Sequence, residues 1–203
     1  MELLVRSITE DILSWSKDFL EQPNKHINNL PVCPYAKKAR TDNKVSIIEH
    51  NDSNTLLEEV INQANSFKDT NKQICIVACN DLSIDADELH NYIHALNFVY
   101  VPQDIYLMPF HPEDGEEEID FLQDTHWESD NEFLMVLIQP FDELERASSQ
   151  LTKTGYYNNW PKDYYDATVN KRKQYRRLRH ERHEKRAKKK DKKKKTKKKN
   201  KKK

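Results

Sequence analysis

The sequence predicts an α/β fold: a small mixed four-stranded sheet with packed helices, then a C-terminal basic helix and a disordered lysine-rich tail. Four segments of strand length, of which the first alternates apolar and polar residues and the second and fourth are apolar throughout, predict the sheet. Segments of helical periodicity lie between them and predict its helices. The charge distribution predicts the tail, because residues 171–203 hold 22 Lys and Arg but 3 acidic residues. Residues 1–170 hold 12 basic and 31 acidic residues, so the net charge of zero conceals two oppositely charged parts.

The chain begins with an amphipathic helix, expected over about residues 7–22. Ser7 and Glu10 form a capping box, in which the Ser side chain accepts from an otherwise unpaired N–H and the Glu side chain reaches back. Apolar residues follow at helical spacing. Pro23 ends the helix.

The four predicted strands are residues 45–49, 74–79, 105–110 and 133–138. The second is apolar throughout, which is typical of a central strand covered on both faces. Pro109 predicts that the third strand ends or bulges there. The helices between and after the strands are expected to run from the capping residues 51–54 to 67, over 83–97 and over 141–151.

Composition divides the chain into an α/β domain over residues 1–152, an aromatic linker over 153–170 and a basic tail over 171–203. After Pro161 few helix breakers occur, so an exposed helix is expected from residue 162 to about 189. Beyond it the lysine repeats cannot bury a core, which predicts disorder.

Cys33 is the candidate reactive residue. A helix that starts at Pro34 would place Cys33 at its N-cap, where the helix dipole and Lys37 favour the thiolate. Lys37, Lys38 and Arg40 would then bind an anionic group. The alternative is a partly buried cysteine whose neighbouring cations face solvent.

His111 follows the third predicted strand, and loops after strands often carry ligand sites in α/β proteins. With Cys33 it would form a thiol–imidazole pair, in which the imidazole is the base or the ion-pair partner. A loop histidine that is simply hydrogen-bonded is the alternative.

Two motifs resemble a bacterial family, the domain-of-unknown-function family 1415: Leu-Pro-Val-Cys-Pro-Tyr-Ala-Lys-x-x-Arg at residues 30–40 and Phe-His-Pro at 110–112. The resemblance covers about residues 7–150. Tyr35 stands where the family has Phe, and an acidic loop replaces the family's polar segment. The resemblance implies that Cys33, Lys37, Arg40 and His111 form one site, and it implies no reaction.

Other ligand classes find little support in the sequence. Two glycines are too few for a dinucleotide or P-loop phosphate motif. His90 and His94 are spaced to share one helix face, but a third metal ligand is missing, so we expect a surface pair. We expect no cofactor and no metal. Cys75 and Cys79 are expected to be buried and inert.

The tail predicts binding to nucleic acid or another polyanion, because clustered cations release counterions from phosphate backbones. A contact between the tail and the acidic loop is a further expectation, since residues 113–132 carry ten acids and no Lys or Arg. The loop is otherwise a solvated segment or a site for a divalent cation. The candidate nucleic-acid-binding residues are Lys171, Arg172, Lys173, Arg176, Arg177, Arg179, Arg182, Lys185 and Arg186.

Two functions therefore stay open. The first is a non-enzymatic protein whose tail binds a polyanion, and the second is a cysteine-dependent enzyme or redox protein that uses Cys33 with His111. An odd number of cysteines and the lack of a secretory leader predict a cytoplasmic protein, and no apolar run is long enough to span a membrane.

Overall fold

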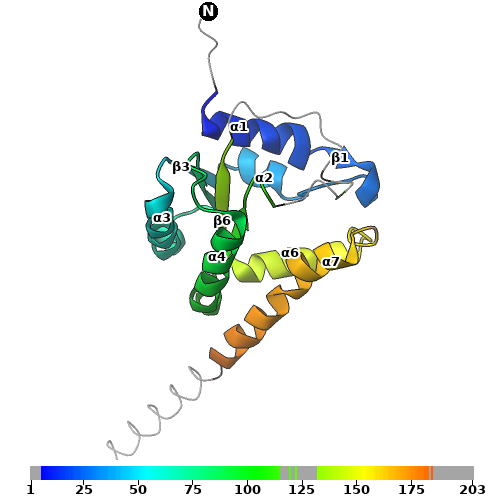
Figure 1. The fold of residues 1–203 in the computed structure, drawn as a ribbon. Coiled ribbons are helices and arrows are strands. Elements are labelled where there is room, and N and C mark those ends of the chain that lie inside the picture. Colours follow the sequence, from blue (N-terminus) through cyan, green and yellow to red (C-terminus); the bar gives the residue numbers. More distant parts are fainter. Residues whose placement is uncertain (1–5, 115–118, 120–121, 123–131, 183, 185–203) are drawn as a thin grey trace, which may run out of the picture.

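The protein is described by a computed structural model over residues 6–114, 119, 122, 132–182 and 184. Its centre is a four-stranded mixed sheet in the order β3-β4-β6-β5 (Figure 1), which confirms the predicted sheet. β3 runs parallel to β4, and β6 runs antiparallel to β4 and β5. The strands are β3 (Val45–His50), β4 (Ile74–Cys79), β5 (Tyr106–Phe110) and β6 (Leu134–Gln139).

Helices surround this sheet, and a second sheet of two short strands precedes it. The α-helices are α1 (Ile8–Trp15), α2 (Ala36–Thr41), α3 (Ser53–Ser66), α4 (Ala86–Tyr100), α6 (Phe141–Thr152) and α7 (Lys162–Tyr165). The shorter elements are η1 (Ser16–Leu20), β1 (Pro23–Asn24), η2 (Lys25–Ile27), β2 (Leu30–Pro31), η3 (Phe67–Asp69), η4 (Val101–Gln103) and η6 (Asp166–Asn170). A last helix, here called the C-terminal helix, covers residues 172–182.

The predicted capping box at the start of α1 is confirmed. The Ser7 hydroxyl accepts from the Glu10 N–H at 3.2 Å, and the Glu10 carboxylate accepts from the Ser7 N–H at 2.9 Å. The helix continues beyond Trp15 as the π-helical turn η1 and ends before Pro23, close to the predicted boundary.

β4 is the buried centre of the fold, as its apolar sequence predicts. Every residue from Cys75 to Cys79 is buried, and alternate side chains face opposite sides of the sheet. Val77 and its neighbours on one face pack with α3 and α4, whereas Ile76 and Ala78 pack with α1 on the other face. The domain is therefore a three-layer sandwich.

β5 is an edge strand, and this position explains why it runs through Pro109. Proline has no N–H to donate, so it is tolerated on an edge strand, and the predicted end or bulge at Pro109 is not seen. Asn97 of α4 covers the outer edge of the strand: its side-chain amide donates to the Leu107 carbonyl at 2.8 Å and accepts from the Leu107 N–H at 2.9 Å.

The C-terminal helix packs on the domain, so the prediction of an exposed helix is wrong for its described part. Tyr175 is 2% exposed and Arg172 is 3% exposed. Tyr175 packs with Tyr106 of β5 and Phe141 of α6 in one apolar cluster. Figure 1 shows the C-terminal helix beside α6.

The aromatic turn at residues 155–160 joins the C-terminal part to the N-terminal part. Tyr156 is buried against Ile27, and its hydroxyl donates to the Val32 carbonyl. Gly155 has φ +76°, and a Cβ there would lie 2.9 Å from the Asn28 amide nitrogen, which donates to the Gly155 carbonyl. Glycine is needed at this position because it tolerates positive φ and leaves room for Asn28.

The edge contact of Asn97 gives a stability prediction. Asn97→Ala would leave the buried N–H and C=O of Leu107 without partners, and we expect a loss of about 2 kcal/mol in the free energy of unfolding. Urea denaturation measures this. Asn91→Ala, at an exposed position of the same helix, is the matched control and should change stability by less than about 0.5 kcal/mol. Equal effects of the two substitutions would contradict the role assigned to Asn97.

Candidate functional site

Cys33 does not occupy the N-cap of α2. The helix begins at Ala36 with Tyr35 as its N-cap residue, so the predicted start at Pro34 is two residues too early. The Cys33 N–H donates to the Leu20 carbonyl at 2.9 Å, and its carbonyl accepts from the Ala36 N–H at 3.0 Å. This backbone pairing fixes Cys33 in a turn between β2 and α2.

The surroundings of the Cys33 thiol favour the protonated form. Burial raises its pKa, and the charge of Glu21 adds to the effect. Hydrogen bonds from the backbone amides of Tyr35 and Ala36 oppose the shift without outweighing burial. A thiolate nucleophile needs a lowered pKa, so this geometry gives the predicted reactive role little support.

Backbone groups occupy both ring nitrogens of His111. Its Nε2–H donates to the Ile84 carbonyl at 3.1 Å, and its Nδ1 accepts from the Glu113 N–H at 3.1 Å. The side chain is buried. Within the described residues, neither ring nitrogen contacts Cys33, so the structure does not bring the predicted pair together.

The three cations predicted to bind an anion have different surroundings. Arg40 forms a two-pronged ion pair with Glu21, with Nε–Oε1 at 2.7 Å and Nη2–Oε2 at 2.8 Å. Lys38 pairs with Asp42 one turn away, and Lys37 is exposed. Arg40 therefore connects η1 to α2.

The basic residues of the C-terminal helix also divide into two groups. Arg172, Arg176 and Arg179 pair with acids of the domain, although Arg176 is itself exposed. Lys171, Lys173 and Arg177 are exposed and belong to the second group. Arg182 is half-buried, and Lys185 and Arg186 lie outside the described residues, as does most of the acidic loop. The predicted contact between tail and loop falls there too.

The ion pairs of the docked arginines form a continuous row along α6. The Nε of Arg172 donates to Glu145 at 2.9 Å, and Arg176 binds the other oxygen of the same carboxylate. Arg179 pairs with Asp142 and lies 3.3 Å from Asp104. In the described part of the basic segment, the acids that pair with these three arginines therefore belong to the α/β domain.

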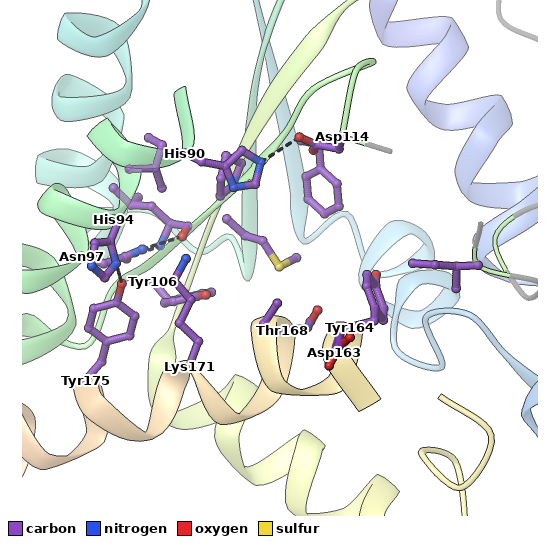
Figure 2. A pocket seen from close by; sticks show the side chains of 17 residues that line it. His90, His94, Asn97, Tyr106, Asp114, Asp163, Tyr164, Thr168, Lys171 and Tyr175 are labelled. Carbon is purple, nitrogen blue, oxygen red and sulfur yellow. Dashed lines mark hydrogen bonds and ion pairs between the residues drawn. The ribbon is translucent and has the colours of Figure 1, made fainter. Parts of the chain in front are cut away.

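A cavity of about 400 Å³ lies between α4, β5 and the segment from Asp163 to Tyr175. Figure 2 shows His90 and His94 of α4 and Lys171 of the C-terminal segment among its lining side chains. Sequence reasoning missed this cavity, because three separate segments form its walls. In the sequence, the spacing of His90 and His94 on one helix face was the feature that pointed to this region.

Each of the two histidines has an acidic or phenolic partner. His90 Nε2 lies 2.8 Å from the Asp114 carboxylate, and His94 Nδ1 is hydrogen-bonded to the Tyr175 hydroxyl. Burial lowers the pKa of His94, and the charge of Lys171 lowers it further. Among the described residues no group of three His, Cys, Asp or Glu is placed to hold a metal ion.

No family model matches this chain, and searches of the curated proteins and of the solved structures give no match. The resemblance to the domain-of-unknown-function family 1415 stays a prediction. None of the described helices has the length and apolar character needed to cross a membrane.

The raised pKa of the Cys33 thiol gives a prediction of reactivity. Alkylation of Cys33 by iodoacetamide across a pH series, followed at the peptide level by mass spectrometry, should give an apparent pKa above the free-thiol value of about 8.5. His111→Gln should leave that pKa unchanged, and the urea-denatured chain supplies the reference. A lower pKa that rises in His111→Gln would instead restore the thiol–imidazole pair.

The Arg40–Glu21 pair gives a prediction of pH dependence. The hydrogen bond from Arg40 is the main cause of the lowered pKa of Glu21. The ion pair therefore stabilises the fold above the ordinary carboxyl pKa of about 4.3, and this stabilisation is lost as the pH falls through the lowered pKa of Glu21. We expect Arg40→Met to cost about 2 kcal/mol at pH 7.

The pH series requires a control at an exposed pair. Lys38→Met breaks the Lys38–Asp42 pair and should cost less than about 1 kcal/mol at any pH. Chemical denaturation at pH 7 and pH 3 compares both variants with the parent. A cost of Arg40→Met that is the same at the two pH values would contradict the assignment.

Proposed function

We propose that the protein binds nucleic acid or another polyanion, without sequence preference, through the basic segment at residues 171–203. The observation that carries the proposal is charge: 22 Lys and Arg against 3 acidic residues in that segment. Such a cluster gains affinity by releasing counterions from a phosphate backbone. In this proposal the α/β domain is the support from which the segment extends.

Because the C-terminal helix is docked on the domain, its basic residues have two different roles in this proposal. Arg172, Arg176 and Arg179 neutralise acids of the domain and attach the helix. Lys173 and Arg177 are exposed and remain available to phosphates. Most of the binding charge then belongs to residues 185–203, which hold 15 Lys and Arg.

The cysteine-dependent alternative has less support, because burial raises the pKa of Cys33 and backbone groups occupy both ring nitrogens of His111. We propose a cytoplasmic location for the protein, since all three cysteines are unpaired and reduced thiols are usual in that compartment.

Binding of a fluorescent single-stranded RNA of mixed sequence tests the proposal. If 6–10 phosphates are contacted, we expect the affinity of the full chain to fall by about 10³–10⁵ between 50 and 200 mM salt. Replacing every Lys and Arg of residues 185–203 by Gln should remove most of this binding. RNA binding that is unchanged in that variant would overturn the proposal.

A chain that ends at residue 184 is the second variant for this test. It keeps Arg172, Tyr175 and Arg179, so the domain retains its docked helix, and its thermal unfolding midpoint checks this. Truncation at residue 170 would be less informative, because it would also expose the cluster that Tyr175 covers. In the full chain, Lys173→Gln with Arg177→Gln should reduce the magnitude of the salt slope by about 1.4.

A further inference from the structure

The cavity of Figure 2 has the size and walls of a small-molecule site. Its volume of about 400 Å³ lies within the usual range for such sites of about 300–1,000 Å³. Apolar side chains form most of its lining, including those of Ile93, Leu107, Met108, Phe110, Tyr164 and Ala167. A ligand that fills it must therefore be largely apolar.

Lys171 is the lysine of the cavity lining, and it is exposed at the mouth of the site rather than held by another side chain. The structure gives its ammonium no hydrogen bond or ion pair with a described residue, and Figure 2 shows it extending from the C-terminal segment toward α4. Its charge contributes to the lowered pKa of His94, behind the larger effect of burial. An anionic group of a ligand would find its counter-charge here.

Three other polar side chains of the cavity already have partners, whereas Asp163 is exposed and has no ion pair with a described residue. Asn97 is bound to the Leu107 backbone, His94 to Tyr175 and His90 to Asp114. Asp163 is exposed on the first turn of α7 and helps to raise the pKa of Lys162, behind the larger effect of Asp166. The ammonium of Lys171 is thus the positive charge that an anionic ligand can complement.

We propose that this cavity binds a small monocarboxylate with an apolar body. The carboxylate pairs with Lys171, and the apolar body lies against Met108, Leu107 and the side chains around them. One ammonium matches one carboxylate, whereas phosphate groups are generally held by several donors, such as a helix N-terminus or an arginine. The proposal is independent of polyanion binding, and it assigns Lys171 to the cavity.

Methionine methyl groups supply a local probe. Met108 lines the cavity, whereas Met135 packs in the cluster covered by α1. In the full chain labelled with ¹³C at methionine methyls, octanoate should shift the Met108 signal saturably and leave the Met135 signal unmoved. The uncharged analogue 1-octanol should bind at least tenfold more weakly, because it cannot pair with the ammonium.

A charge-removing variant separates the carboxylate contact from apolar binding. Lys171→Gln should weaken octanoate at least tenfold and leave 1-octanol unaffected. Lys153→Gln, which removes a charge at an exposed position outside the cavity, should bind octanoate like the parent. Equal unfolding midpoints for the three proteins would show that the fold is intact.

Three outcomes would overturn the proposal: no response of Met108, equal responses of Met108 and Met135, or unchanged octanoate affinity in Lys171→Gln. None of them affects the test of polyanion binding, in which RNA is the ligand and residues 185–203 are altered. The two proposals are therefore tested independently of each other.

Discussion

The position of the C-terminal helix depends on the hydrogen bonds that the guanidinium of Arg172 donates. This guanidinium is buried, and it donates to the Glu145 carboxylate at 2.9 Å, to the Ser148 hydroxyl at 3.0 Å and to the Thr168 carbonyl at 2.6 Å. A buried charge is tolerated only when it is paired and its donors are satisfied. These partners hold the C-terminal helix in one position against α6.

Several features of the protein follow from that position. Tyr175 lies three residues beyond Arg172 and therefore turns toward the same side, where it fills the apolar space between β5 and α6. Lys171 precedes Arg172 and lines the neighbouring cavity. The docked helix thus forms one wall of the cavity and also carries the start of the basic segment.

Local signals predicted much of the domain. The capping box of Ser7, the apolar run of β4 and the helical periodicities depend on residues close in sequence, and the structure contains each element. The basic helix was predicted incorrectly because charged residues were assumed to face solvent. The spacing of Arg172, Arg176 and Arg179 does place them on one helix face. Their partners Glu145 and Asp142, however, lie about thirty residues away, and nothing in the sequence distinguishes these two from the other acids of the domain.

The candidate site was harder to predict than the fold, because it depends on which loops meet. Cys33 and His111 were linked by a motif resemblance, but each is held by backbone groups of different segments. Leu20 and Ala36 bind the backbone of Cys33, and Ile84 and Glu113 bind the ring of His111. The cavity depends on α4, β5 and the C-terminal segment at once. The residues that line such a cavity can be predicted only once the strand order and the docking of the last helix are known.

Asn97 has a consequence for association between molecules. Its side-chain amide presents to Leu107 the donor and acceptor that a neighbouring strand would present. The sheet is thereby closed at β5, because no further strand can pair with that residue while the amide is in place. Growth of the sheet into an open-ended assembly is blocked on this side, which leaves β3 as the edge through which strands of two molecules would have to meet.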